Sequence, residues 1–171
     1  MEQLQADLQL VRIYRSLIRC RYEDALRQLD ELLCDRPDHG VAHGILADLC
    51  NWLLDDPRRA RVHFRFAVRF APEVEMHYHK FAKVLVTLGD AAGLEELIQL
   101  AQGRSGIDRT PLIIACAEVK ERMGLWSDAL VHYRSAATLA TDDDTEEACG
   151  KSVERMLRRL DAARWGRISQ A

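Results

Sequence analysis

A group of histidines and cysteines is the first candidate for a metal site in this sequence. His39 and His43 are four residues apart, and Cys34 and Cys50 flank them. A zinc site needs ligands that converge tetrahedrally. These four residues straddle the start of an expected helix, and no second compact pair of ligands follows. We therefore expect structural histidines, and neither a metal nor another cofactor.

The usual catalytic motifs are missing from the sequence. It contains no HExxH, no GxSxG and no glycine-rich phosphate loop, and no cysteine has an evident histidine partner. The remaining candidates for catalysis are isolated residues without a recognisable spacing. We therefore predict that the protein is not an enzyme.

Arginine is concentrated in one segment. Arg61, Arg65 and Arg69 are spaced by four residues and follow Arg58, and no acidic residue occurs between positions 57 and 72. On a helix this spacing places the three side chains along one face. Such a basic stripe could bind an acidic partner or phosphates. It could equally be a solvated outer face, which is the more common role of charged runs and the one we favour.

The composition limits the class of protein. The chain has 171 residues, 48% of them hydrophobic, and a net charge of −3, which does not indicate nucleic acid or membrane as a partner. Its five cysteines are odd in number and contain no CxxC pair, which is typical of reduced thiols. The sequence has neither a signal peptide nor an apolar run of about 20 residues. We expect a cytoplasmic protein.

The elements that carry these residues are predicted to be helices. In the segment 56–73, Ala60, Phe64 and Ala67 lie on one helical face, and Pro72 ends the helix. The two small residues allow a neighbouring helix to approach closely, and the aromatic ring fills the space beside them. The same arrangement returns at Ala129, Tyr133 and Ala136.

This helical pattern recurs at a constant interval. Pro37 and Pro72 are 35 residues apart, and Ala101 lies 34 residues after Ala67 and 35 before Ala136. A period of this length made of two helices resembles the tetratricopeptide repeat family. Large–small pairs and turn glycines support the resemblance: Leu46-Ala47, Phe81-Ala82, Cys116-Ala117, Gly89 and Gly124.

The resemblance implies an all-α fold, an α-solenoid of four helix-turn-helix repeats closed by a C-terminal capping helix. The expected repeats span about 6–38, 40–73, 75–107 and 109–142, and the capping helix spans 143–164. Together they form one domain, 1–164, followed by a tail, 165–171. Stacked repeats of this kind form a superhelix with a concave groove.

In the family, first-helix side chains line the groove and bind the partner. Carried over to this sequence, the positions are Asp48, Asn51, Trp52, Met76, His79, Lys83, Ile114, Glu118 and Arg122. This mixed set suits an extended peptide or a partner helix. Trp52 could instead pack under the turn at Asp55 and Asp56, and we assign Trp126 to the core.

The predicted function is therefore non-catalytic: an adaptor, scaffold or co-chaperone that holds a partner peptide or helix in the groove. The alternative is a bacterial chaperone of the type III secretion kind, which would protect an aggregation-prone secreted subunit. Nucleic-acid binding through Arg58 to Arg69 is a third hypothesis, against which the acidic groove residues and the small negative net charge argue. A homodimer is compatible with the sequence.

Overall fold

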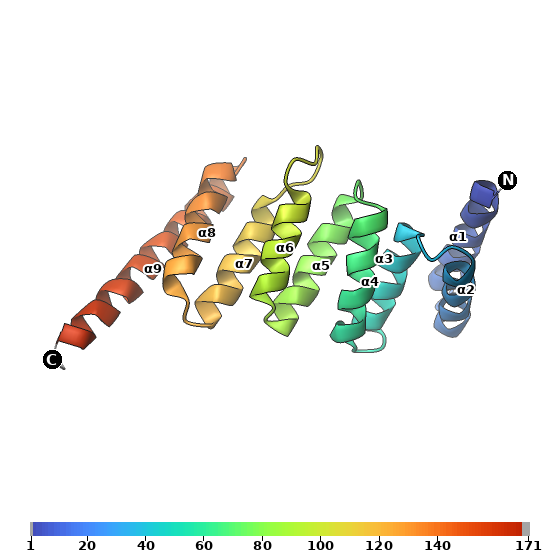
Figure 1. The fold of residues 1–171 in the computed structure, drawn as a ribbon, viewed down its shortest axis with the longest axis horizontal. Helices are drawn as coiled ribbons and strands as arrows, with labels where there is room; N and C mark the ends of the chain where they lie inside the picture. The colour runs from blue at the N-terminus through green and yellow to red at the C-terminus, as the bar shows by residue number, and fades with distance from the viewer. Residues whose placement is uncertain (1, 169–171) are drawn as a thin grey trace. The chain divides into compact units, whose positions relative to one another are not determined.

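The computed structural model describes residues 2–168, and these residues form nine α-helices joined by turns and by a longer loop, 102–109, between α6 and α7 (Figure 1). Their bounds are α1 Glu2–Ile18, α2 Tyr22–Asp35, α3 Gly40–Trp52, α4 Pro57–Phe70, α5 Glu75–Leu88, α6 Ala91–Ala101, α7 Thr110–Arg122, α8 Trp126–Leu139 and α9 Asp143–Ile168. No strand occurs among the described residues. The predicted all-α class is confirmed.

The chain divides into two compact units. The first unit, residues 1–84, contains α1 to α4 and the larger part of α5. The second unit, residues 85–171, contains the end of α5 and the helices α6 to α9. The two units are described separately below.

Local signals in the sequence explain where the helices begin and turn. Pro57 occupies the first turn of α4, where its missing N–H costs no hydrogen bond. The Asp56 side chain accepts a hydrogen bond from the Arg59 backbone N–H at 2.9 Å and so caps the helix. Gly89 and Gly124 have φ values of 66° and 76°, a region that favours glycine. The predicted turn glycines are thus confirmed.

The core of the first unit contains the small–aromatic–small face that the sequence predicts on α4. Ala60, Phe64 and Ala67 are buried, and the Phe64 ring stacks on Phe81 of α5 with centroids 6.0 Å apart. At Gly40 the backbones of α3 and the end of α4 approach so closely that a Cβ would lie 2.5 Å from the Ala71 nitrogen. Small residues thus set the distance between these helices.

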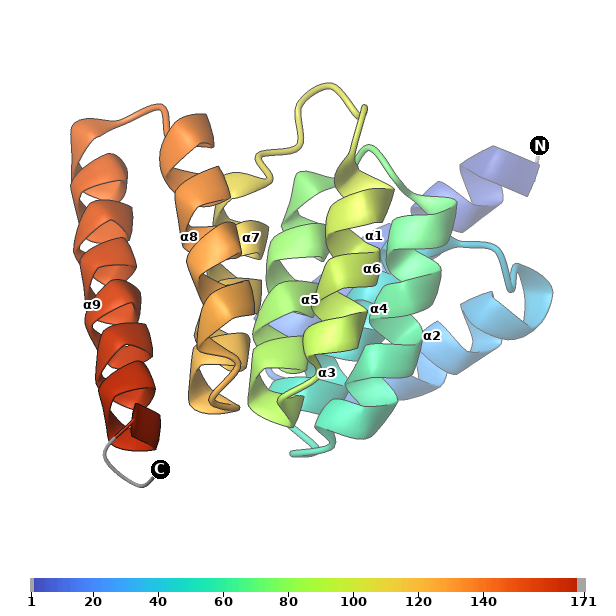
Figure 2. The ribbon, with the colours of Figure 1, turned by 60° about the vertical axis from the view of Figure 1, so that its left-hand side comes forward.

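In the second unit α9 covers α8, and the two helices lie side by side in Figures 1 and 2. Met156 of α9 is fully buried in a cluster with Ala117 of α7 and with Ala129 and Tyr133 of α8. Trp126 packs against this cluster as a partly buried side chain, which agrees with its predicted place in the core. The apolar face of α9 therefore closes the second unit.

The last helix is longer than expected. The helix α9 continues to Ile168, four residues beyond the predicted end of the capping helix, so its last turn includes part of the expected tail. None of the helices formed by residues 2–168 combines the length and the apolar character that crossing a bilayer requires.

Candidate functional site

The first unit contains a cleft of about 440 Å³ between side chains of α1, α2, α3 and α5. Thirteen residues line it: Tyr14, Leu17, Tyr22, Val41, Gly44, Ile45, Asp48, Leu49, Trp52, Val74, Met76, His77 and Lys80. Most of them are apolar or aromatic. We call this space the first-unit cleft.

Three large apolar side chains of this cleft are exposed. Trp52 is 57% exposed, Met76 56% and Tyr14 46%. The Trp52 ring meets Tyr22 edge-on, with centroids 5.2 Å apart and planes at 83°. This contact orients the indole. Trp52 is therefore not buried beneath the turn at Asp55 and Asp56, and its role as a contact anchor stays a prediction.

The polar side chains of the cleft come from two helices. Lys80 of α5 forms an ion pair with Asp48 of α3. His77 is buried against α3, where a Cβ on Gly44 would lie 2.3 Å from the His77 Nε2 atom. Burial lowers the pKa of His77, because a charged ring would lose its hydration, while the Asp48 carboxylate opposes this shift. The cleft thus pairs an apolar wall with one compensated pair of charges.

The structure brings together only part of the groove predicted in the first unit. Asp48, Trp52 and Met76 line the cleft, whereas Asn51, His79 and Lys83 are not among its lining residues. The His79 Nε2 atom instead lies 3.8 Å from a carboxylate oxygen of Glu75, one helical turn away. The remaining groove positions stay predictions.

Sequence reasoning missed the side chains that α1 and α2 contribute to the cleft. Tyr14 lies on α1 and is 46% exposed. Tyr22 opens α2 and lies against Trp52. Lys80 was missed because its partner Asp48 is 32 residues away in the sequence. The signal in the sequence was the pair of aromatic residues at helix ends, Tyr22 at the start of α2 and Trp52 at the end of α3.

The second unit contains a separate cleft of about 650 Å³, which includes the groove positions predicted on α7. Ile114, Glu118 and Arg122 all line it. The Arg122 guanidinium donates a hydrogen bond to the Val86 carbonyl oxygen at 2.9 Å. The predicted positions of the fourth repeat therefore share one space, together with residues of α9.

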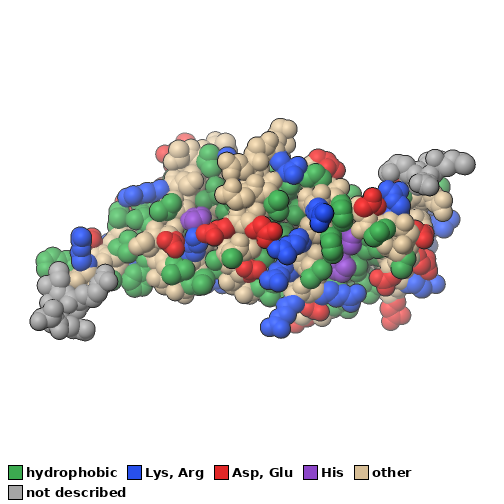
Figure 3. Space-filling model, viewed as in Figure 1, with side chains coloured by type: hydrophobic (Ala, Val, Ile, Leu, Met, Phe, Trp, Pro, Cys, Tyr) green, Lys and Arg blue, Asp and Glu red, His purple; other side chains and the backbone are tan. Residues whose placement is uncertain are grey.

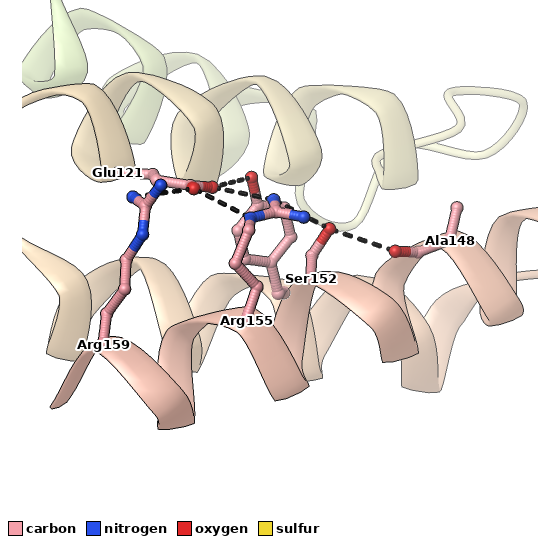
Figure 4. A network of polar contacts seen from close by, with 6 residues as sticks. Glu121, Ala148, Ser152, Arg155 and Arg159 are labelled. Atoms are coloured by element: carbon pink, nitrogen blue, oxygen red, sulfur yellow. Dashed lines mark hydrogen bonds and ion pairs between the residues drawn. The ribbon is translucent and has the colours of Figure 1, made fainter. Parts of the chain in front are cut away.

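Glu121 organises the polar wall of the second-unit cleft (Figure 4). Its carboxylate accepts two hydrogen bonds from Arg155 at 2.9 Å and one from the Tyr133 hydroxyl at 2.9 Å, and it pairs with Arg159 at 3.0 Å. The Arg155 bonds lower the pKa of Glu121, since they stabilise the charged carboxylate. Burial and the same carboxylate raise the pKa of Tyr133. The network joins α7, α8 and α9.

The predicted basic stripe lies on α4. Arg58, Arg61, Arg65 and Arg69 are all exposed, and Figure 3 shows Lys and Arg side chains beside hydrophobic ones over this helix. Phe70 is 38% exposed, and the Arg69 guanidinium lies 5.5 Å from its ring centroid. The expectation of a solvent-facing stripe agrees with these exposures, and its partner stays a hypothesis.

The histidines considered for zinc have structural contacts. His39 accepts a hydrogen bond from the Ala42 backbone N–H at 3.3 Å and caps α3. The His43 Nδ1 atom lies 3.1 Å from the His63 Nδ1 atom, and the His43 Nε2 atom lies 3.0 Å from the Pro37 carbonyl oxygen. Because a carbonyl only accepts, His43 Nε2 carries the proton and His63 donates to His43 Nδ1.

Comparison with known proteins yields matches at the level of structure. No protein-family model matches the sequence, and no curated protein matches it. Among solved structures, Pseudomonas aeruginosa PilF is similar with a TM-score of 0.64 and 16% identity, over 95% of this chain and 72% of that one. MamA from Desulfovibrio magneticus RS-1 has a TM-score of 0.60 and 14% identity, over 92% and 96%.

A third similar structure is PilW, described as a widely conserved type IV pilus biogenesis factor, with a TM-score of 0.57 and 12% identity, over 92% of this chain and 76% of that one. These neighbours are built from tetratricopeptide repeats. The chain has the tetratricopeptide-repeat fold. At such low identities the similarity concerns the fold of this tetratricopeptide-repeat (TPR) chain and not its partner.

Proposed function

We propose that this TPR chain is a non-catalytic protein-interaction module whose first-unit cleft binds an apolar segment of a partner protein. The observation that carries the proposal is the exposure of Trp52, Met76 and Tyr14 around one cleft. Large apolar side chains gathered at one concave place are typical of interaction sites, whereas scattered ones are not. Trp and Tyr are also enriched among the residues that dominate binding energies.

The proposed ligand is a helix or an extended peptide with an apolar anchor. The anchor would lie against Trp52 and Met76. The rigid indole and the flexible thioether side chain would both offer it apolar contact area. The Asp48–Lys80 pair offers both an acceptor and a donor to the polar groups of the peptide beside the anchor. The other predicted groove residues, Asn51, His79 and Lys83, would make secondary contacts.

A binding experiment with matched variants tests this proposal. Partners captured from an extract of the native organism with the wild-type chain should be lost with the double variant Trp52→Ala/Met76→Ala. The control is Val131→Ala, which truncates an apolar side chain of similar exposure (64%) on α8 of the second unit. With the purified partner, we expect the double variant to weaken binding about 10- to 100-fold. Equal binding by all three proteins would exclude the cleft.

The proposed role is that of a cytoplasmic adaptor or scaffold, and the alternative is a chaperone for an aggregation-prone secreted subunit. Both use the same cleft, but they differ in the state of the partner. An adaptor should bind a partner that is soluble when expressed alone. A chaperone should be needed during expression, so the partner would become soluble only when the TPR chain is present. Co-expression with and without the chain distinguishes the two roles.

A further inference from the structure

Three successive helices of the second unit bring together a carboxylate, a thiol and an imidazole. Glu95 of α6, Cys116 of α7 and His132 of α8 each offer one ligand atom, and these atoms lie within 4.8 Å of one another. Cys116 is fully buried, His132 partly buried and Glu95 exposed. We call this group the Glu–Cys–His cluster.

We propose that the Glu–Cys–His cluster is a binding site for a divalent transition-metal ion, with Zn²⁺ as the preferred ion. Thiolate, imidazole and carboxylate are the three ligand types that zinc accepts, and three protein ligands leave one position of a tetrahedron open. The mixed sulfur, nitrogen and oxygen set disfavours Mg²⁺ and Ca²⁺, which prefer oxygen ligands. This site is independent of the first-unit cleft and of the proposed partner.

The histidine of the cluster is already held in the form that a ligand needs. His132 Nδ1 lies 2.9 Å from the backbone carbonyl oxygen of Asp128. A carbonyl only accepts hydrogen bonds, so Nδ1 carries the proton and Nε2 keeps its lone pair. A backbone carbonyl that fixes the tautomer and orientation of the ring is the usual second partner of a metal-bound histidine.

A lysine side chain neutralises the carboxylate of the cluster. The Lys120 side chain is only 9% exposed, and its ammonium group forms a 2.5 Å ion pair with Glu95. Cys116 lies one helical turn before Lys120 on α7, and the two groups interact electrostatically. The ammonium thus supplies the positive charge for this carboxylate when no metal is bound, and a metal ion would have to displace it. The exposed Asp128 carboxylate also raises the pKa of Lys120.

Binding would involve one covalent change in the protein. The Cys116 S–H bond breaks, a sulfur–metal bond forms, and the proton passes to the solvent, since only the thiolate is a good ligand. The metal would then join α6, α7 and α8 through their side chains. We therefore expect metal binding to stabilise the second unit.

Titration with Co²⁺ and Zn²⁺ tests the site. With Co²⁺ the wild-type chain should show the near-ultraviolet charge-transfer band of a cobalt–thiolate bond, and Zn²⁺ should abolish this band by competition. Cys116→Ala should remove the band, whereas Cys149→Ala, which removes another buried thiol of the same unit, should keep it. His132→Gln, at a partly buried position, should weaken Zn²⁺ binding about 10- to 100-fold and remains informative if Cys116→Ala lowers stability.

A second variant tests the role of Lys120. Lys120→Met removes the competing charge but keeps an apolar stem of similar length, so we expect Zn²⁺ to bind about tenfold more tightly or better. A cobalt–thiolate band that is absent from the wild type and from Lys120→Met, or one that persists in Cys116→Ala, would overturn the proposal. So would Zn²⁺ binding that is unaffected by His132→Gln.

Discussion

At the scale of single residues, Glu121 joins three other side chains of the second unit. It serves as the acceptor for Arg155, Arg159 and Tyr133, and its side chain is only 13% exposed. Hydrogen bonds to a charged group that is largely shielded from water are among the stronger ones in proteins. We therefore assign to this carboxylate the role of holding α9 on α7 and α8.

Glu121→Gln should lower the free energy of unfolding of the second unit by about 1–3 kcal/mol, because a neutral amide replaces a carboxylate that faces two guanidinium groups. The effect also depends on pH. The folded pKa of Glu121 lies below its ordinary value of 4.5, so its contribution is complete above pH 4.5 and is lost as the pH falls through the folded pKa. Urea unfolding of the wild type and the variant at several pH values measures both the loss of stability and its dependence on pH. A variant as stable as the wild type at neutral pH would contradict the assignment.

The histidine pair of the first unit predicts a second pH dependence. Burial lowers the pKa of both His43 and His63 below the ordinary value of 6.5. As the pH falls through 6.5, the unfolded chain takes up protons that the folded chain does not, so the first unit loses stability until the lowered folded pKa values are passed.

His63→Asn should reduce this loss, since the amide can still donate to His43 Nδ1 but does not titrate. The measurement is the hydrogen-exchange protection of α3 and α4 at about pH 7.5 and about pH 5.5. The decrease between the two should be smaller in the variant than in the wild type. It should not vanish, because His43 and His77 still titrate. Equal decreases would show that the pair does not govern the pH dependence.

At the scale of elements, the contact of α3 with α5 depends on one glycine. A Cβ at Gly44 would lie 2.3 Å from the buried His77 ring, whereas a Cβ at Gly150 of α9 would meet no atom within 4 Å. Both glycines are inside helices. They therefore form a natural pair for separating helix propensity from packing.

Gly44→Ala should destabilise the first unit by about 1–3 kcal/mol, because the added methyl group forces the His77 ring from its place. Gly150→Ala should instead stabilise the second unit by about 0.5–1 kcal/mol, since alanine is the better helix former and no contact is crowded. Thermal unfolding followed by circular dichroism measures both changes. Stabilisation by Gly44→Ala would mean that α3 and α5 can separate without cost.

At the scale of the whole molecule, the two units offer different surfaces to a partner. The first-unit cleft is mainly apolar and aromatic, whereas the second-unit cleft is lined by Glu118, Glu121 and three arginines, Arg122, Arg155 and Arg159. The groove predicted from the TPR pattern includes residues of both units. A partner that uses the whole predicted groove should therefore respond to charge changes in each unit.

The double variant Lys83→Glu/Arg122→Glu tests this expectation with one exposed residue from each unit. Each change should weaken partner binding by about 1 kcal/mol, while thermal stability stays nearly the same. Titration of the purified partner with both single variants and the double variant gives the comparison. An effect of only one change would confine the binding surface to one unit. Charge reversal at Arg65 on the α4 stripe serves as a control and also tests nucleic-acid binding, which would fall steeply with salt.

The sequence by itself determined the helices, their turns and their repeat, because these depend on local information. These local signals are the helical spacing of apolar residues, the prolines at helix boundaries and the turn glycines. Each depends only on residues that are close together in the sequence. The small–aromatic–small faces also predicted which side of α4 and α8 is buried, and Ala60, Phe64, Ala129 and Tyr133 lie in the core as expected. The groove positions, the domain boundaries and the cellular compartment stay predictions.

Only the tertiary structure decided which polar side chains meet. Asp48 and Lys80 are 32 residues apart, and Arg155 is 34 residues from Glu121. Glu95, Cys116 and His132 come from three helices and carry no motif in the sequence. Such contacts depend on how helices pack against one another. Many different separations in the sequence can lead to the same contact between two side chains. The sequence therefore predicts the helices and their repeat, whereas the packing of the helices determines which polar side chains form a site.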